Sequence, residues 1–561
     1  MVRSRKRYVY ILISAAIVVI AALLLIFLHK SESPPIQKYL ASRSTGIPYY
    51  YFNEEEHRLI KSSELLPRGI QVTDLEENYT ENGIEYAMIA YDGNSYYIDS
   101  QSMVDDQKDV IQETEVWVRT SATVYTNPTG PEITSFARKG DCLEVVGFDE
   151  MQADGSIHKY KIHFTDSNGE DVTGWVYGKY LLDNQEDALA VNAEIQEIHK
   201  DRIYSGMELY GGQPTTLDWY PVEKPSFASN PICETASAMY INIEGVKNID
   251  EYIEIAKNNG VNAMVIDVKD GESVAYPCEE IKEISPSSYA SAYYTAKDYQ
   301  EAIRKCLDAG IYCIGRIVAF KDYIYSGDHP ETCITSPESS VIWPSAYSRD
   351  CWCFNVTLAR AAAQFCGFNE IQYDYVRFPE ESYSMSLNEA TDFRNEYDEE
   401  KAEAIQNFCY YAADALHEIG VYLSVDVFGE CVNSYVTAYG QYFPSMSLVV
   451  DAISAMPYPD HYGRTEDTWT DPYAIMYSWA QKASQRQSEI PTPAIARTWV
   501  AAYDVPFWSL DVLCDASYIA REVQALVDGG ITGGFITWNY NSNLDKYRLI
   551  APAWNKTYTP S

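Results

Sequence analysis

From about residue 237 onward, strand-like apolar runs alternate with helical stretches for about 320 residues. No other feature restricts the fold as strongly, because alternating strands and helices imply parallel strands joined by helical crossovers. Eight strand candidates are enough to close a barrel. An open doubly wound sheet is the alternative, but it usually carries a glycine-rich first turn, which this sequence lacks. The sequence therefore predicts an α/β fold, a (β/α)₈ TIM barrel.

We place this barrel domain at residues 231–555. The expected strands are residues 238–243, 263–268, 311–319, 370–376, 421–428, 448–456, 494–501 and 533–538. The expected helices are residues 250–259, 296–309, 356–365, 399–419, 471–485 and 515–528.

The N-terminus carries a long apolar run. Residues 8–28 are apolar apart from Ser14, which is long enough to cross a bilayer as a helix. A cleaved signal peptide is the alternative, but the run exceeds a usual signal sequence and no small-residue cleavage site follows it. We expect residues 1–30 to form a cytoplasmic tip and an uncleaved single-pass anchor in the cell membrane, with the bulk of the chain extracellular. The basic residues that set this orientation are Arg3, Arg5, Lys6 and Arg7.

Two strand-rich blocks, residues 45–110 and 111–184, follow a polar stretch at residues 31–44 that we interpret as a stalk. The second block closes on residues 174–181, GWVYGKYL, and resembles bacterial SH3-like domains; the first resembles a degenerate copy. The resemblance implies binding to peptidoglycan or another wall polymer, and a rigid spacer without a ligand is the alternative. Residues 185–230 are expected to form a connecting helix and a linker.

Charge and composition exclude several classes of protein. The net charge is −39, which repels nucleic acids, so we expect no nucleic-acid partner. With 46% hydrophobic residues the chain is globular. The 12 cysteines form no CxxC pair and the histidines show no metal-binding spacing, so we expect no metal and no cofactor.

Polar residues late in the second to fifth barrel strands mark a candidate site. Catalytic side chains of TIM barrels stand at the carboxyl ends of the strands. An unpaired charge inside a barrel costs about several kcal/mol, so such residues form either a structural ion network or a working site. Their presence on four consecutive strands favours a site. They are Asp267, Lys269, Arg316, Gln372, Asp374 and Asp426.

The same residues belong to motifs that recur in a recognisable order. These are residues 267–270 (DVKD), 316–322 (RIVAFKD), 370–379 (EIQYDYVRFP), 424–429 (SVDVFG) and 456–463 (MPYPDHYG). The stretch from about residue 205 to about residue 550 resembles the glycoside-hydrolase TIM-barrel family of bacterial envelope proteins. This resemblance implies the barrel fold and the cleavage of polysaccharides.

One motif departs from that family. Its seventh strand usually ends in Trp-Leu-Gln-Asp-Phe, whereas this chain has Trp499-Val500-Ala501-Ala502-Tyr503. Any role of the missing glutamine and aspartate in substrate binding or acid catalysis is then absent or moved to Asp504. The departure favours an altered specificity, or a barrel that binds without cleaving.

Glycoside hydrolysis needs two carboxyl groups, one to donate a proton and one to act as nucleophile or base. Asp374, flanked by Lys269 and Arg316, is the expected nucleophile or stabiliser of the transition state, because nearby cations favour an ionised carboxylate. Asp426 is the expected proton donor, with Glu430 and Asp460 as the next choices. Neighbouring strand ends favour the short separation of a retaining enzyme.

Further residues are expected to bind the substrate. Arg377 either orients the substrate or pairs with Glu380. The aromatic and hydrogen-bonding residues suit a sugar site, although core packing explains each one singly as well. The expected substrate-binding set is Asp267, Lys269, Arg316, Gln372, Arg377, Tyr458, His461, Trp499 and Trp538.

These observations predict a membrane-anchored, extracytoplasmic glycoside hydrolase that acts on cell-wall or extracellular polysaccharide. A non-catalytic wall-binding scaffold with a decayed barrel is the main alternative, favoured by Ala501 and Ala502 and opposed by Asp374 and Asp426. A lytic or sugar-modifying enzyme of another reaction type is the third.

Overall fold

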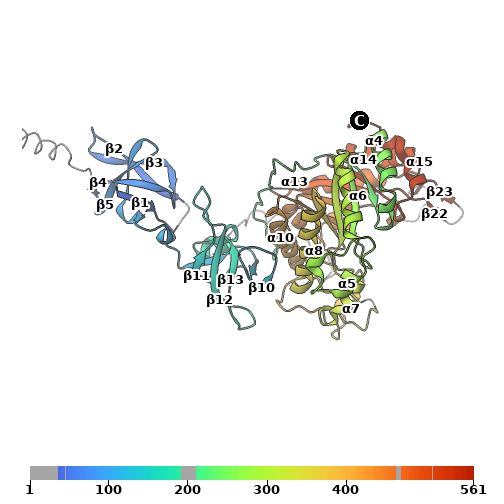
Figure 1. Ribbon diagram of the computed structural model, residues 1–561, viewed down its shortest axis with the longest axis horizontal. Helices are drawn as coiled ribbons and strands as arrows, with labels where there is room; N and C mark the ends of the chain where they lie inside the picture. Colours follow the sequence, from blue (N-terminus) through green and yellow to red (C-terminus); the bar gives the residue numbers. More distant parts are fainter. Residues whose placement is uncertain (1–35, 44–45, 191–209, 341, 463–468, 508–509) are drawn as a thin grey trace, which may run out of the picture. The chain divides into compact units, whose positions relative to one another are not determined.

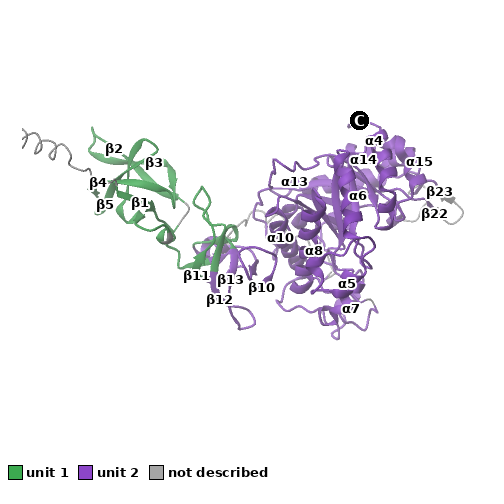
Figure 2. Cartoon of the chain, viewed as in Figure 1, with its two compact units in different colours: residues 1–116, 144–161, 177–183 green, residues 117–143, 162–176, 184–561 purple. Residues whose placement is uncertain are grey.

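The structure, a computed structural model, describes residues 36–43, 46–190, 210–340, 342–462, 469–507 and 510–561 (Figure 1). The chain divides into two compact units (Figure 2). Residues 1–116, 144–161 and 177–183 form the first unit, and residues 117–143, 162–176 and 184–561 form the second. The expected membrane segment at residues 8–28 lies outside the described residues. No helix within the described ranges combines the length and apolarity needed to cross a bilayer.

The first β-rich region is a seven-stranded antiparallel sheet in the order β3-β2-β6-β5-β4-β1-β7. Its core contains the fully buried Leu40, Ile89 and Ile98. The prediction of a stalk at residues 31–44 is partly wrong, because residues 36–40 form strand β1, which pairs with β4 and β7. The last residue of this strand, Leu40, is buried. The elements are β1 (Ile36–Leu40), β2 (Gly46–Asn53), β3 (Arg58–Pro67), β4 (Gln71–Glu81), β5 (Ile84–Tyr91), β6 (Asn94–Asp99), η1 (Ser100–Ser102), β7 (Met103–Val104) and η2 (Gln107–Asp109).

The second β-rich region is also a seven-stranded sheet, in the order β10-β9-β13-β12-β11-β8-β14. The GWVY sequence forms the end of β13, where the side chain of Val176 is fully buried and Gly174 lies close to Val124. The β-rich N-terminal part of the chain fits SH3-like domains. The elements are β8 (Glu115–Val118), β9 (Ala122–Tyr125), β10 (Ile133–Ala137), β11 (Cys142–Phe148), β12 (Lys159–Thr165), β13 (Asp171–Tyr177), η3 (Gly178–Tyr180), β14 (Leu181–Leu182) and α2 (Gln185–Ala190).

Eight parallel strands close into a barrel, as the sequence predicted. The largest error in strand length concerns β20, which begins only at Ala452, because the preceding apolar run forms the short helix α11 (Phe443–Val449), with Pro444 in its first turn. The strands are β15 (Ala236–Ile241), β16 (Ala263–Lys269), β17 (Tyr312–Val318), β18 (Glu370–Asp374), β19 (Tyr422–Phe428), β20 (Ala452–Met456), β21 (Ile495–Ala501) and β24 (Gly534–Trp538). A hairpin of β22 (Val505–Phe507) and β23 (Leu510–Val512) lies between the last two strands in sequence.

Helices surround the barrel (Figure 1). The helix before β18, α8, begins at Arg349, earlier than expected, because the Ser348 side chain caps it by accepting a hydrogen bond from the Cys351 N–H. The long helices are α4 (Ile249–Asn259), α6 (Ala296–Asp308), α8 (Arg349–Cys366), α10 (Lys401–His417), α13 (Tyr473–Ser488), α14 (Ala516–Asp528) and α15 (Leu544–Trp554). The short helices are η4 (Glu244–Asn248), η5 (Glu279–Ile281), α5 (Pro286–Ala290), α7 (Tyr323–Asp328), η6 (Pro330–Thr332), α9 (Ser382–Ser386), η7 (Gly429–Val432) and η8 (Pro459–His461).

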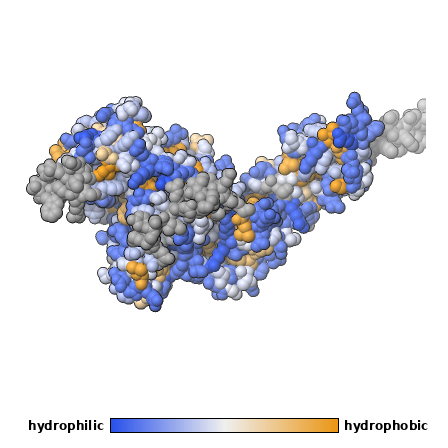
Figure 3. Space-filling view, turned by 180° about the vertical axis from the view of Figure 1, so that it is seen from behind, coloured by the Kyte–Doolittle hydropathy of each residue, from blue (hydrophilic) through white to orange (hydrophobic). Residues whose placement is uncertain are grey.

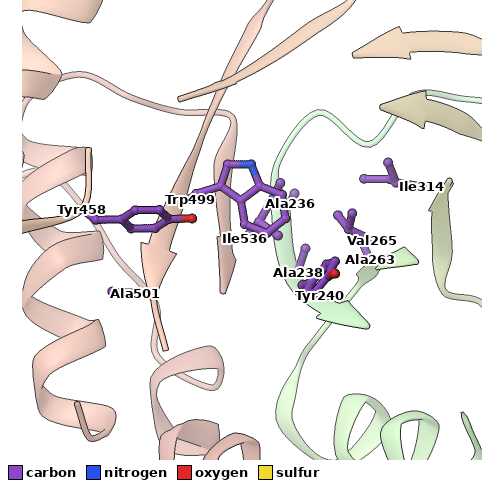
Figure 4. Packing of buried hydrophobic residues seen from close by; sticks show 10 residues of the cluster. All are labelled: Ala236, Ala238, Tyr240, Ala263, Val265, Ile314, Tyr458, Trp499, Ala501 and Ile536. Carbon is purple, nitrogen blue, oxygen red and sulfur yellow. The ribbon is translucent and has the colours of Figure 1, made fainter. Parts of the chain in front are cut away.

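Small and large side chains fill the inside of the barrel in layers. Ala236, Ala238 and Ala263 lie near the amino ends of their strands, and Tyr240 and Trp499 lie nearer the carboxyl ends (Figure 4). Pairing small with large residues fills the tapering space without cavities. On the face shown in Figure 3, hydrophilic side chains predominate and apolar ones form small separate patches, as on ordinary protein surfaces.

Candidate active site

Arg316 on β17 is the centre of a buried ion network at the carboxyl end of the barrel. Its Nη1 donates to Asp267 Oδ1 on β16 at 2.7 Å, and its Nη2 donates to Asp374 Oδ2 on β18 at 2.5 Å. Arg316 Nε lies 3.9 Å from Asp426 Oδ2 on β19. Each of these four residues is at most 6% exposed. The structure therefore brings four of the predicted site residues together, from four consecutive strands.

Asp374 is surrounded by N–H donors. Its Oδ2 also accepts from Arg316 Nε at 3.2 Å, and its Oδ1 accepts from the backbone N–H of Tyr375 at 2.6 Å. Tyr375 has a φ of +54°, a left-handed conformation that costs a non-glycine residue about 1–2 kcal/mol. This turn directs the Tyr375 N–H at the carboxylate. Charge-assisted donors on both oxygens suit a carboxylate anion.

Asp426 has the opposite environment. Its Oδ1 accepts from the indole Nε1 of Trp499 at 2.7 Å, whereas its Oδ2 has no hydrogen-bond partner among the described residues. Burial raises the pKa of Asp426 well above its usual value; the neighbouring Asp374 charge raises it further, and Arg316 only partly offsets these effects. Asp426 is therefore suited to carry a proton beside the anionic Asp374.

Asp267 binds Arg316 and is itself bound by Tyr240. The Tyr240 hydroxyl donates to Asp267 Oδ2 at 2.5 Å. Burial raises the pKa of Asp267 to about 6, although Arg316 and Tyr240 act against this rise. Burial also works against the Arg316 charge, but the charges of Asp267 and Asp374 outweigh it and hold the pKa of Arg316 well above its usual value. Asp267 thus fixes the guanidinium in place.

Lys269 does not flank Asp374, contrary to the sequence-based expectation. Its Nζ donates to Asp322 Oδ2 at 2.5 Å and lies 5.1 Å from the ring centroid of Phe354. The register of β16 against β17 shifts between Asp267 and Lys269, so the two residues do not share a face. Lys269 is only 2% exposed. Its ion pair with Asp322, the residue that caps α7, anchors the loop before that helix.

Gln372 and Arg377 also contact protein groups. Gln372 is fully buried and its Nε2 donates to Ser454 Oγ at 3.1 Å, one layer below Asp374. Arg377 donates to Glu380 Oε1 at 2.9 Å and lies 4.5 Å from the ring centroid of Phe428. With 2% exposure, Arg377 shapes the loop after β18.

The predicted aromatic residues make different contacts. Trp499 is buried and holds Asp426, and the Trp538 ring packs 4.3 Å from Tyr240, centroid to centroid. Tyr458 is buried and contacts His461 edge to face, with ring centroids 5.3 Å apart. Of these residues, His461 borders an open cleft.

This cleft has a volume of about 1180 Å³ and lies beside the ion network. The alternative acids Glu430 and Asp460 both line it. Glu430 accepts hydrogen bonds from the hydroxyls of Tyr435 and Tyr439, and Asp460 accepts one from Tyr503. Sequence reasoning named Glu430, Asp460 and His461, and Tyr462 lies within the MPYPDHYG motif, but most of the other lining residues were not predicted. The lining includes Tyr375, Glu380, Phe428, Glu430, Asn433, Tyr435, Met456, Asp460, His461, Tyr462, Trp479 and Lys482.

The two alanines at the end of β21 are buried, and their carbonyl groups are engaged. Cys514 Sγ donates to the Ala501 carbonyl at 2.7 Å, and Asn539 Nδ2 donates to the Ala502 carbonyl at 2.7 Å. Asp504 accepts from Lys546 Nζ at 2.6 Å and from the Cys514 N–H. Asp504 is therefore held by Lys546 of α15 and by the Cys514 backbone.

A closed (β/α)₈ barrel with two aspartates at the carboxyl ends of adjacent strands offers the kind of carboxyl groups that barrel glycosidases use. Residues 238–544 match the family described as "Putative glycosyl hydrolase domain", and this match covers more than half of the chain. The chain belongs to this family, and its barrel is a glycan-acting hydrolase domain.

Solved structures with a similar fold include two glycan-acting proteins. The chain is 11% identical to the PgaB (BpsB) glycoside hydrolase domain of Bordetella bronchiseptica, over 58% of this chain and 100% of that one, with a TM-score of 0.40. It is 13% identical to a chitinase of Chromobacterium violaceum, over 57% and 100%, with a TM-score of 0.34. A hypothetical protein of Ruminiclostridium thermocellum is 29% identical over 34% of this chain and 97% of that one, with a TM-score of 0.28. No curated protein matches the chain.

Proposed function

We propose that this protein is a membrane-anchored, extracytoplasmic glycoside hydrolase that cleaves cell-wall or extracellular polysaccharide with Asp374 and Asp426. One observation carries the proposal: two neighbouring aspartates beside one arginine differ in their surroundings. Asp374 accepts from three N–H donors, whereas Oδ2 of the buried Asp426 has no hydrogen-bond partner among the described residues. Pairs of carboxyl groups held in different protonation states are the working parts of glycosidases.

In the first step an Asp374 oxygen attacks the anomeric carbon while the glycosidic bond breaks. The leaving oxygen takes the proton of Asp426, whose raised pKa keeps that proton available. In the second step ionised Asp426 takes a proton from water, the water oxygen bonds to the anomeric carbon, and the ester to Asp374 breaks. Arg316 stays in contact with Asp374 throughout.

The distances support a retaining mechanism. The Oδ2 atoms of Asp374 and Asp426 lie 3.2 Å and 3.9 Å from Arg316 Nε. The two oxygens can therefore be no more than about 7 Å apart, a limit that admits the roughly 5–5.5 Å of retaining enzymes and only the short end of the roughly 6.5–9.5 Å of inverting ones.

The proposed location rests on the N-terminal sequence and the SH3-like regions. Residues 8–28 are long enough to span a bilayer, and basic residues precede them. A wall-binding region between anchor and barrel would keep the hydrolase near its polymer. External protease on intact cells is expected to cut residues 45–184 and to spare residues 1–7, and a mature chain that starts after residue 30 would contradict the anchor.

The activity is tested by incubating the full chain with fragments of wall polymer and exopolysaccharide and measuring new reducing ends. We expect cleavage of at least one neutral or amino-sugar polymer, and no cleavage by Asp374→Asn. Binding of several glycans without cleavage of any would reject the hydrolase in favour of a scaffold. Cleavage by Asp374→Asn at the wild-type rate would reject the assignment of the nucleophile.

A further inference from the structure

The cleft beside the ion network is large enough for several sugar units. Its volume of about 1180 Å³ exceeds the roughly 300–1,000 Å³ of sites that hold drug-sized ligands. Its lining includes residues that come shortly after the proposed catalytic pair in the chain, because Tyr375 directly follows Asp374, and Glu430 lies four residues after Asp426. The cleft is therefore the place where a glycan chain leading away from the cleaved bond would lie.

Half-buried aromatic rings line this cleft. Tyr375, Phe428, Tyr435 and Tyr462 all belong to the lining, and each is partly exposed. Such rings offer flat apolar faces, which suit the carbon-bound hydrogens of a pyranose ring. Trp479 forms part of the wall instead, since it is buried and its indole donates to the Gly429 carbonyl at 2.9 Å.

The charges of the lining are mostly negative. Glu380, Glu430 and Asp460 face one exposed ammonium group, that of Lys482. The carboxylate of Glu380 pairs with Arg377, and that of Asp460 accepts the Tyr503 hydroxyl. The whole chain carries a net charge of −39, which adds to the negative field.

Glu430 differs from the other two acids. Its Oε1 accepts from Tyr435 at 2.8 Å and its Oε2 accepts from Tyr439 at 2.9 Å, which fixes the orientation of the carboxylate. Both of these donors are neutral hydroxyls, no ion pair of Glu430 is found within the described ranges, and the residue is exposed. An oriented, exposed carboxylate with free lone pairs is suited to bind an ammonium group.

We infer that the cleft binds a chain of amine-bearing sugars, with Glu430 in contact with a sugar ammonium group, and that it excludes polyanionic glycans. The inference rests on the proposed function, because the cleft belongs to the same site. It adds the charge class of the substrate, which the catalytic pair alone leaves open.

Binding of charged and uncharged glycans tests this inference. The full chain carrying Asp374→Asn, in detergent, is titrated calorimetrically with oligosaccharides of glucosamine, N-acetylglucosamine and galacturonate of matched length. We expect the glucosamine chain to bind about tenfold more tightly than the neutral chain, and the galacturonate chain to bind weakest. The glucosamine advantage is expected to shrink as salt is raised. Equal binding of all three, no binding of any, or preference for galacturonate would overturn the inference.

A second variant assigns the effect to one carboxylate. Glu430→Gln in the same background is expected to remove the advantage of the glucosamine chain while leaving the neutral chain within about twofold. Glu254→Gln, on an exposed face of α4 away from the cleft lining, is the matched control and is expected to change neither. Equal loss for both ligands, or no loss, would overturn the role of Glu430. Failure of the proposed hydrolase is separately visible as binding of glucosamine chains without cleavage by wild type.

Discussion

Two buried arginines inside the same barrel have opposite surroundings. At the amino end, Arg497 donates to Glu370 Oε1 and to the Cys233 carbonyl, each at 2.7 Å, and the Tyr312 hydroxyl donates to Glu370 Oε2. Both side chains of this ion pair are fully buried. At the carboxyl end, Arg316 forms ion pairs with three aspartates, and Oδ2 of one of them, Asp426, has no hydrogen-bond partner among the described residues.

The difference in charge balance explains why we assign a structural role to the Arg497 pair and a chemical role to the Arg316 network. One guanidinium with one carboxylate is neutral and leaves both carboxyl oxygens occupied, so nothing remains to react. One guanidinium cannot balance three carboxylates, and repulsion between buried like charges favours the neutral, protonated form of at least one of them. β18 carries both arrangements on one face, with Glu370 at its start and Asp374 at its end.

The largest expected effect is on turnover. Asp374→Asn keeps the shape and removes the charge, so kcat should fall about 10⁴-fold while the melting temperature and glycan affinity stay near those of wild type. Hydrolysis of a glycan that wild type cleaves, followed with calorimetric melting, checks this. A fall in both activity and stability would show that Asp374 resembles Glu370 in being structural.

The amino-end pair should respond in the opposite way. Glu370→Gln leaves the buried Arg497 without its counter-charge and is expected to lower the free energy of unfolding by about 3–5 kcal/mol. The fraction that remains folded should retain its kcat. Urea denaturation gives the stability, and Glu370→Gln with Arg497→Met should recover part of the loss. A loss below about 1 kcal/mol would contradict the comparison.

Asp426→Asn should act only where a proton is needed. Substrates with poor leaving groups should lose about a hundredfold or more in kcat/KM, whereas activated aryl glycosides should be nearly unaffected in the glycosylation step. Because the reactive form is protonated, wild-type kcat/KM should fall as the pH rises through the raised pKa of Asp426, and this limb should disappear in the variant. An unchanged limb would transfer the acid role to Glu430 or Asp460.

The smallest effect concerns Asp267. Its pKa of about 6 in the folded chain exceeds its usual value, so the folded state binds the proton more tightly than the unfolded state. Stability should therefore fall as the pH rises from about 4 to about 6, by at most about 3 kcal/mol from this group. Asp267→Asn should flatten this slope, as measured by urea denaturation at several pH values. An unchanged slope would show that other groups cause it.

The barrel and its ion network could be predicted because both depend on local patterns. The strand runs were apolar and bounded by turns, and the parity of Asp374 and Asp426 fixed their direction into the barrel. Lys269 was misplaced because the shift in strand register next to Asp267 leaves no mark in the sequence. The helix α11 was missed because a short apolar run fits a strand or a buried helix equally well.

The contacts that the sequence did not reveal are those between distant segments. Asp322 lies far along the chain from Lys269, and no pattern within either segment links them. The cleft combines loops after β18, β19 and β20 with one face of α13, so its lining depends on loop conformation. Arg497 was accessible to the same reasoning, since it lies two residues before Trp499 on the same face of β21.

The left-handed turn at Tyr375 gives the backbone and the side chain of this residue separate roles. Its backbone N–H holds Asp374, and its side chain lines the cleft. Every amino acid except proline supplies that N–H, so the side chain can be exchanged for another that tolerates the left-handed backbone without removing the contact to Asp374. Position 375 is thus a point at which substrate preference can diverge by single mutations in descendants of this protein while the chemistry is retained.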